Sequence, residues 1–94
     1  MRQLVETPRF RRMFRKHVRR DPALRVRIEQ TLHLMSEDAF APSLATHKLS
    51  GDLFGLLACS CGYDCRIIST IEVDDVAQQE VVLLLSIGTH EEVY

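Results

Sequence analysis

The spacing of apolar side chains changes once along this chain, and that change constrains the fold more than any other feature. In residues 8–35 apolar side chains recur every three or four positions, as in amphipathic helices. From about residue 53 they run together or alternate with polar ones, as in strands. Helices grouped early and strands grouped late indicate an α+β fold.

Two helices with a proline in the first turn are predicted in the first half. Thr7 precedes Pro8 and Asp21 precedes Pro22, so each helix has a side chain that can cap it. The apolar face of the first helix comprises Phe10, Met13, Phe14, His17 and Val18. The apolar face of the second comprises Leu24, Ile28, Leu32 and Met35. A short strand at residues 3–7 precedes the helices, and residues 36–45 form a connecting loop.

Three strands are predicted in the second half, at residues 53–59, 66–73 and 80–87. The last is the most hydrophobic, so we expect it to be the central strand of the sheet. A turn at residues 61–63 and a polar loop at residues 74–79 join the strands. The predicted order is β-α-α-β-β-β in a single domain, residues 1–94. The two N-terminal helices pack on one face of a mainly antiparallel sheet.

The net charge of −1 conceals a strong asymmetry between the two parts of the chain. Residues 1–35 hold ten Lys and Arg against three acids, whereas residues 36–94 hold two against ten. A basic part that is mostly arginine favours a phosphate-bearing or acidic partner. A solvated helix face is the simpler alternative, and the number of basic residues leaves the two interpretations about equal.

Composition also excludes several classes of protein. No apolar run approaches the roughly 20 residues that a membrane-spanning helix needs, and no apolar stretch follows the first arginine as in a secretory signal. We therefore expect a cytoplasmic protein. Three cysteines, at positions 59, 61 and 65, argue against a disulfide framework. A zinc site is a weaker alternative because no second cysteine pair is present, and a nucleophilic cysteine enzyme is weaker still.

Three segments of the second half carry a resemblance to a known family. Residues 47–51 read His-Lys-Leu-Ser-Gly, residues 63–68 read Tyr-Asp-Cys-Arg-Ile-Ile, and residues 88–94 read Gly-Thr-His-Glu-Glu-Val-Tyr. In this order, and on these predicted elements, they resemble the RelE/ParE toxin superfamily, and its YafQ-type members most. With the helix pair, the resemblance covers nearly the whole chain.

The resemblance implies a toxin of a type II toxin–antitoxin system. Such toxins enter the ribosomal A site and cut messenger RNA, and an antitoxin protein from the same operon silences them in a hetero-oligomer. The implied partners are thus the antitoxin, messenger RNA and the ribosome with its RNA. No cofactor and no metal are expected. The basic helix residues expected to meet the antitoxin or ribosomal RNA are Arg9, Arg12, Arg15, Lys16 and Arg19.

RNA cleavage without a metal needs a base for the 2'-hydroxyl, an acid for the departing 5'-oxygen and a cation for the phosphate. Histidine suits both proton transfers because its ordinary pKa lies near neutrality. The residues expected to be catalytic are His47, Asp64, Arg66, His90 and Tyr94. His17 and His33 lie on helices without a motif and are expected to be a partly buried packing residue and a surface residue.

The catalytic candidates have distinct expected roles and simpler alternatives. His47 and His90 are the proton-transfer residues. Asp64 is expected to accept the 2'-hydroxyl proton or to orient a histidine, or else to be an ordinary turn aspartate. Arg66 is expected to bind phosphate, or else to pair with an acidic residue of a neighbouring strand, Glu72 or Glu80.

Tyr94 is expected to stack on a base or donate a hydrogen bond, and its simpler alternative is a frayed terminus. The residues expected to touch RNA are Lys48, Ser60 and Cys65. Cys65 stands where YafQ-type toxins usually have an aromatic residue, and Ser60 where a further histidine would fall. The sequence assigns no role to the acidic pair Glu91 and Glu92 beside the expected site.

Two other functions stay open on sequence alone. A ParE-like toxin would inhibit DNA gyrase and would not need His47, Asp64 and His90 together. A catalytically degenerate member would bind only its antitoxin, and the departures at Ser60 and Cys65 make this alternative reasonable.

Overall fold

The computed structural model describes residues 2–94. Its strands and helices, in chain order, are β1 (Gln3–Glu6), α1 (Pro8–Val18), α2 (Pro22–Glu37), β2 (His47–Lys48), β3 (Leu57–Gly62), β4 (Cys65–Asp74), β5 (Gln79–Gly88) and α3 (His90–Val93). Two short 3-10 helices, Pro42–Leu44 and Gly51–Leu53, lie in the connections on either side of β2. Among the described residues, no helix is long and apolar enough to cross a membrane.

The strands form one five-stranded sheet in the order β1-β5-β4-β3-β2. Only the β1–β5 pairing is parallel, and the other three pairings are antiparallel. The expected α+β class and the mainly antiparallel sheet are therefore confirmed. The expectation that β5 is the central strand is wrong, because β4 occupies the middle position and β5 lies between β4 and the edge strand β1.

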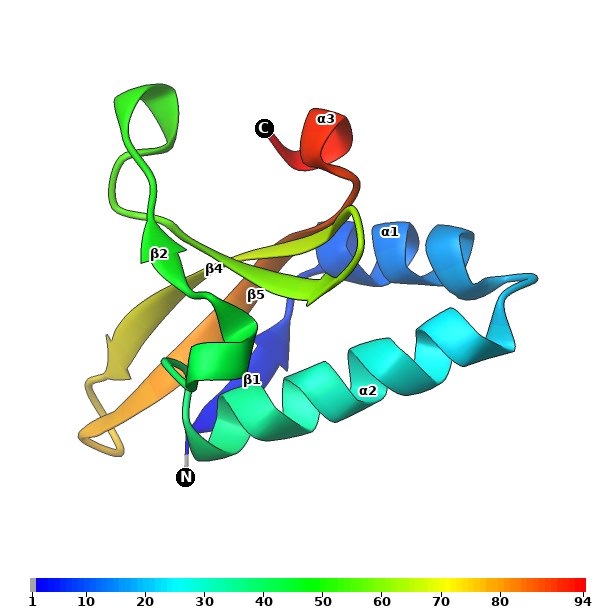
Figure 1. The fold of residues 1–94 in the computed structure, drawn as a ribbon. Helices are drawn as coiled ribbons and strands as arrows, with labels where there is room; N and C mark the ends of the chain where they lie inside the picture. The colour runs from blue at the N-terminus through cyan, green and yellow to red at the C-terminus, as the bar shows by residue number, and fades with distance from the viewer. Residues whose placement is uncertain (1) are drawn as a thin grey trace.

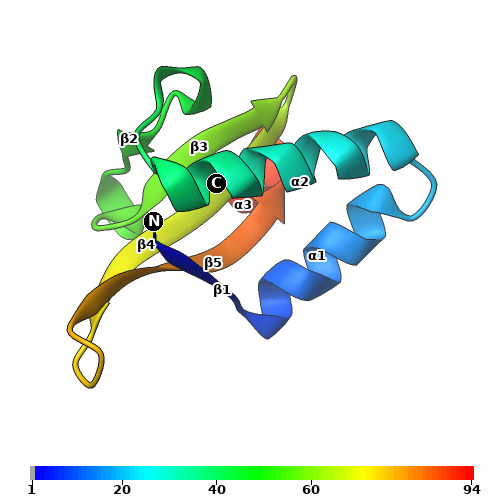
Figure 2. The ribbon, with the colours of Figure 1, turned by 90° about the horizontal axis from the view of Figure 1, so that it is seen from below.

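The two faces of the sheet carry different elements. Figures 1 and 2 show α1 and α2 together over one face, with α2 running along it. Figure 1 also shows α3 and the segment that follows β2 rising from the other side of the sheet. Two segments far apart in the sequence thus flank the same face.

Each face has its own apolar core. The larger core lies under α1 and α2, where Phe10, Ile28, Ile67 and Leu84 are fully buried. The smaller core lies on the opposite face and consists of Ala58, Ile68 and Val93, with partly buried leucines around them. Neighbouring residues of a strand point to opposite faces, so Ile67 and Ile68 of β4 serve different cores.

The predicted helix starts are confirmed. The backbone N–H of Phe10 donates to the hydroxyl of Thr7 at 3.2 Å, and the backbone N–H of Leu24 donates to the carboxylate of Asp21 at 3.0 Å. Thr7 also donates its own hydroxyl hydrogen to the carbonyl oxygen of Leu84 at 2.7 Å. The first helix is thereby capped and tied to β5 by the same side chain.

The prediction of a strand at residues 53–59 is partly wrong. The strand begins only at Leu57, and the preceding residues form a 3-10 turn and a loop. Gly55 has a φ of 93°, which a strand does not allow, and the side chain of Phe54 is 84% exposed. The apolar residues at positions 53–56 therefore resemble a buried strand in sequence although they form a turn and a loop. The two-residue strand β2 and the one-turn helix α3 were also not predicted, because both are too short to show a repeat.

We expect Phe10→Ala to lower the free energy of unfolding by about 3–5 kcal/mol, because the ring is fully buried and the cavity left behind cannot be refilled. Urea unfolding followed by circular dichroism measures this change. Val76→Ala is the control, since its side chain is 96% exposed, and should stay within about 0.5 kcal/mol. Equal losses in both variants would contradict the assignment of the core.

Candidate active site

An open groove of about 600 Å³ collects most of the predicted catalytic residues. Its lining residues come from β2 and the segment after it, from β4 and from α3. They are His47, Lys48, Leu49, Ser50, Leu53, Arg66, His90 and Tyr94. Residues that lie 47 positions apart in the chain, His47 and Tyr94, therefore line one surface.

His47 lies on the edge strand β2 and is exposed to solvent. Its ring atom Nδ1 lies 3.1 Å from the carbonyl oxygen of Ala45. This contact suits the tautomer in which Nδ1 carries the hydrogen and donates it to Ala45, since a carbonyl can only accept. The lone pair of Nε2 is then left to accept a proton from a substrate.

Arg66 is the second residue of β4 and is half-buried. Its Nη1 atom donates to the carbonyl oxygens of Cys65 at 2.9 Å and of Gly62 at 3.2 Å. Within residues 2–94 no carboxylate pairs with Arg66. The alternative of a partner on a neighbouring strand is therefore not observed. Two carbonyls orient one edge of the guanidinium, and its remaining N–H groups are left for an anion.

His90 and Tyr94 lie at the two ends of α3. Their rings contact each other edge to face, with centroids 4.4 Å apart and an interplanar angle of 71°. The side chain of Tyr94 is 41% exposed, and its backbone N–H donates to the carbonyl oxygen of His90 at 3.1 Å. Tyr94 is therefore held against His90 by two contacts, which disfavours the alternative of a frayed terminus.

Known structures share this architecture although the sequence identities are low. The sequence matches no protein-family model and no curated protein. The YoeB/ParE toxin from Agrobacterium tumefaciens superposes with a TM-score of 0.77 at 16% identity, covering 94% of this chain and 98% of that one. A chain of the E. coli DinJ–YafQ complex also reaches 0.77, at 12% identity, covering 100% and 99%. A metal-bound toxin from Helicobacter pylori reaches 0.74 at 21% identity, covering 100% of both chains.

The chain has the RelE-like toxin fold. The fold expected from the three sequence motifs is thus confirmed. The groove is lined by the segment that follows β2 and by the C-terminal helix, and Figure 1 shows these two segments on the sheet face away from α1 and α2.

Asp64 does not line the groove, unlike the other four predicted catalytic residues. It lies in the turn between β3 and β4 with a φ of 48°, and its carboxylate accepts a hydrogen bond from the backbone N–H of His90 at 3.1 Å. That N–H belongs to the first turn of α3, where helical N–H groups have no partner within the helix. Of the two expected roles, the contact favours orientation of a histidine over proton abstraction.

Ser60 and Cys65, two of the three residues expected to touch RNA, also lie outside the groove. Ser60 is half-buried, and its hydroxyl bonds locally with the backbone of Gly62. The side chain of Cys65 is buried, and its sulfur forms a disulfide with Cys61, so contact between Cys65 and RNA is ruled out in this conformation. The reason is strand geometry, because Cys65 and Arg66 are neighbours and point to opposite faces.

The disulfide between Cys61 and Cys65 was not expected from an odd cysteine count. The two Cα atoms lie 5.0 Å apart on either side of the β3–β4 turn. The count argues against a complete set of pairs, but it does not exclude one pair and one free thiol. The free thiol is Cys59, which is buried, and this burial raises its pKa to about 12 against a smaller opposing effect of Arg66. A thiolate nucleophile at Cys59 is thereby disfavoured.

Among residues 2–94, no group of three or more His, Cys, Asp or Glu side chains is arranged to hold a metal ion. The five basic residues singled out, four on α1 and Arg19 directly after it, are all exposed. Lys16 lies 3.9 Å from Glu92, and the structure gives Arg9, Arg12, Arg15 and Arg19 no carboxylate partner among the described residues. These four arginines are available to an outside anion. His17 and His33 are half-buried and exposed, as predicted.

Sequence reasoning assigned no role to Thr89 and Glu92, which hold α3 in place. The backbone N–H of Thr89 donates to the Glu92 carboxylate at 2.9 Å, and the N–H of Glu92 donates to the Thr89 hydroxyl at 3.3 Å. This reciprocal pair is a capping box. The Thr-x-x-Glu spacing within residues 89–92 was the sequence signal that predicts it.

Glu92 is held in its charged form. The hydrogen bond from the Thr89 backbone lowers the pKa of this carboxyl most, partial burial opposes the change, and the charge of His17 lowers the pKa further. Because the pKa is lowered in the folded chain, the stabilisation is present at neutral pH and is lost as the pH falls through the folded-state pKa.

Thiol counting tests the cysteine assignments. Without reductant, we expect one thiol per denatured chain to react with a chromogenic disulfide reagent, and three after reduction, because one disulfide and one free cysteine are present. In the folded protein at pH 8 the single thiol should react much more slowly than free cysteine, because its pKa is raised to about 12 and the side chain is buried. Three fast thiols in the unreduced protein would contradict both the disulfide and the burial of Cys59.

Proposed function

We propose that this chain is the toxin of a type II toxin–antitoxin system and that it cuts messenger RNA. The observation that carries the proposal is the groove in which His47, Arg66, His90 and Tyr94 meet. Two histidines and an arginine can supply the base, the acid and the cation that metal-independent RNA cleavage needs. The likeness to YoeB/ParE and YafQ toxins supports the proposal through the fold.

In the proposed reaction, His47 removes the proton from a 2'-hydroxyl through Nε2. The resulting oxygen attacks the adjacent phosphorus, and the bond from phosphorus to the 5'-oxygen breaks. His90 gives a proton to that departing oxygen, so the products are a 2',3'-cyclic phosphate and a free 5'-hydroxyl. Arg66 binds the phosphate oxygens with the N–H groups that do not contact backbone carbonyls, and so stabilises the added negative charge.

Two further residues of the groove bind rather than react. Tyr94 offers a ring face on which a base can stack, because its edge-to-face contact with His90 leaves part of the ring exposed. Lys48 lies on β2 next to His47 and is exposed, so its ammonium can contact a neighbouring phosphate. Asp64 acts on the backbone of His90 and is therefore a positioning residue in this scheme.

The ribosome and an antitoxin are the proposed partners. The unpaired arginines of α1 form a positive surface outside the groove, which suits ribosomal RNA during cleavage and an acidic antitoxin segment during inhibition. The E. coli YafQ structure is a complex with DinJ, which agrees with a protein partner for chains of this fold.

We expect induction of the wild type to stop growth and to create new 5' ends within translated messages. His47→Ala and His90→Ala should each lower cleavage by roughly 100- to 10,000-fold, because each removes a proton-transfer group. Primer extension on cellular RNA measures the new ends. His33→Ala is the matched control, since this histidine is on the surface of α2 with a side chain that is 72% exposed.

Two outcomes would contradict parts of this proposal. An absence of new 5' ends with the wild type would reject the proposed nuclease activity and would favour the alternative, inhibition of DNA gyrase. Equal cleavage by the wild type and His90→Ala would reject His90 as the acid.

We expect simultaneous reversal of Arg12, Arg15 and Arg19 to glutamate to weaken binding of the cognate antitoxin at least about tenfold, because each change replaces attraction by repulsion. The measurement is calorimetry with the purified antitoxin. Arg25→Glu, a single reversal on α2 at a residue that contacts Glu29 at 3.6 Å, controls for general charge. If the triple variant bound the antitoxin with unchanged affinity, the proposal that the antitoxin binds at these arginines would be wrong.

A further inference from the structure

The helix that carries His90 has only four residues, His90–Val93. A single turn is not stable by itself, because fixing the first turn costs more conformational entropy than its hydrogen bonds return. Its position must therefore come from contacts with the rest of the molecule. Val93 supplies one, since its side chain is buried in the smaller core, and two carboxylates supply the polar ones.

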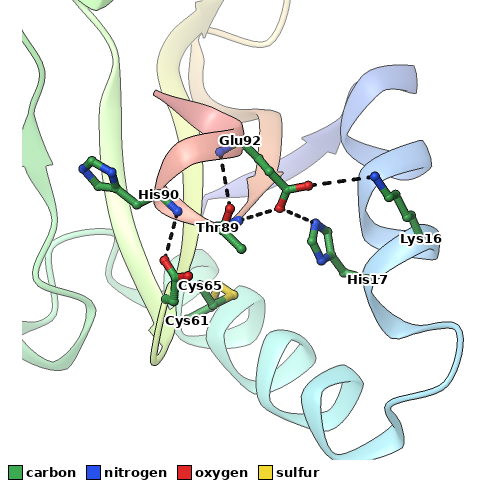
Figure 3. A network of polar contacts seen from close by, with 8 residues as sticks. Lys16, His17, Cys61, Cys65, Thr89, His90 and Glu92 are labelled. Atoms are coloured by element: carbon green, nitrogen blue, oxygen red, sulfur yellow. Dashed lines mark hydrogen bonds and ion pairs between the residues drawn. A yellow bond between two sulfur atoms is a disulfide. The ribbon is translucent and has the colours of Figure 1, made fainter.

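Glu92 connects α3 to α1. One carboxylate oxygen of Glu92 accepts from the backbone of Thr89 and also lies 3.0 Å from Nε2 of His17. The other oxygen lies 3.9 Å from Nζ of Lys16. The His17 contact lacks the geometry of a hydrogen bond, so it acts through charge when the imidazole is protonated. Figure 3 shows this network between the two helices.

The space around this carboxylate is limited by the backbone of β5. A methyl carbon added at Gly88 would lie 2.9 Å from the carboxylate oxygen Oε1 of Glu92 and 3.2 Å from Nε2 of His17. Both distances are shorter than ordinary van der Waals contact, so the two side chains pack directly on the glycine. A glycine at position 88 therefore leaves the space that the side chains of Glu92 and His17 occupy, and a larger residue would displace them.

The side chains of His90 and Glu92 leave α3 in different directions. In Figure 3 the Glu92 carboxylate points toward α1, whereas the imidazole of His90 points away from it. Glu92 does not line the groove, but His90 does. A rotation of α3 that broke the contacts of Glu92 with α1 would therefore also move the imidazole of His90.

We propose that Glu92 is a positioning residue for His90. It docks α3 on α1, while Asp64 holds the first turn of α3 from the β3–β4 turn, and the two together set the direction in which the imidazole enters the groove. This role deepens the proposed RNA cleavage and rests on it, because the direction of His90 affects a rate only if His90 transfers a proton. The same contacts direct the charge of Glu92 toward the cations of α1.

The test compares Glu92→Ala and Glu92→Gln with Glu91→Ala, an exposed neighbour that removes the same charge. Ribosomes programmed with messenger RNA are the substrate, and single-turnover rate and binding affinity are measured separately. We expect Glu92→Ala to lower the rate roughly 10- to 100-fold with affinity nearly unchanged, because misplacement of a reacting group acts on the rate. Glu92→Gln keeps an oxygen for Thr89 but loses the charge contacts with His17 and Lys16, so its rate should lie between those of Glu92→Ala and the wild type. Glu91→Ala should stay within about threefold of the wild type.

A second readout does not depend on cleavage. The backbone N–H of His90 donates to Asp64 of the β3–β4 turn at 3.1 Å, so it should be protected from hydrogen exchange in the wild type and in Glu91→Ala. Glu92→Ala should lose this contact and its protection. If the wild type cuts nothing, the proposed function fails, and this contact still decides the positioning role.

The inference is overturned if Glu92→Ala keeps both the rate and the protection of the His90 N–H. Thermal unfolding checks that each variant is folded. Should Glu92→Ala not fold, Gly88→Ala replaces it, because the added carbon displaces the same carboxylate without removing its charge. The same two outcomes then apply to Gly88→Ala, so retention of both the rate and the protection of the His90 N–H overturns the inference there as well.

Discussion

The antiparallel pairing of β4 with β5 is the interaction on which the rest of the structure depends. These two ten-residue strands pair from Arg66 opposite Gly88 to Asp74 opposite Gln79. Both cores draw on them, and β1 and β3 each add to one of their free edges. At one end of the ladder Arg66 stands opposite the glycine that leads into α3. The proposed phosphate-binding group and the proposed acid are therefore placed by backbone hydrogen bonds of one strand pair.

Long elements were predictable because each shows its repeat several times. The two helices revealed their starts through capping residues and prolines, and the strand pair revealed itself through hydrophobic runs. The 3-10 turn before β3 was missed because a run such as Leu-Phe-Gly-Leu-Leu is apolar whether it is buried or exposed. Only tertiary packing, which leaves Phe54 exposed, distinguishes the two cases.

The candidate site was predictable where a motif placed a side chain at the end of a strand, as for His47 and His90. It was not predictable where burial and pairing decided the outcome. Cys65 was expected to reach RNA, but the alternation of the strand turns it into the larger core, where a disulfide retains it. Asp64 was predicted as a site residue, yet sequence could not show that its carboxylate contacts a backbone N–H instead of facing the groove.

The disulfide between Cys61 and Cys65 encloses the turn that holds Asp64. Each chain therefore exists in one of two covalent forms, set by the thiol–disulfide balance of its surroundings. In one form the turn beside His90 is cross-linked, and in the other it is held by hydrogen bonds without a covalent link. Two laboratories that assayed this protein with and without a dithiol in the buffer would be comparing different molecules, and a difference in their rates would be informative about that turn.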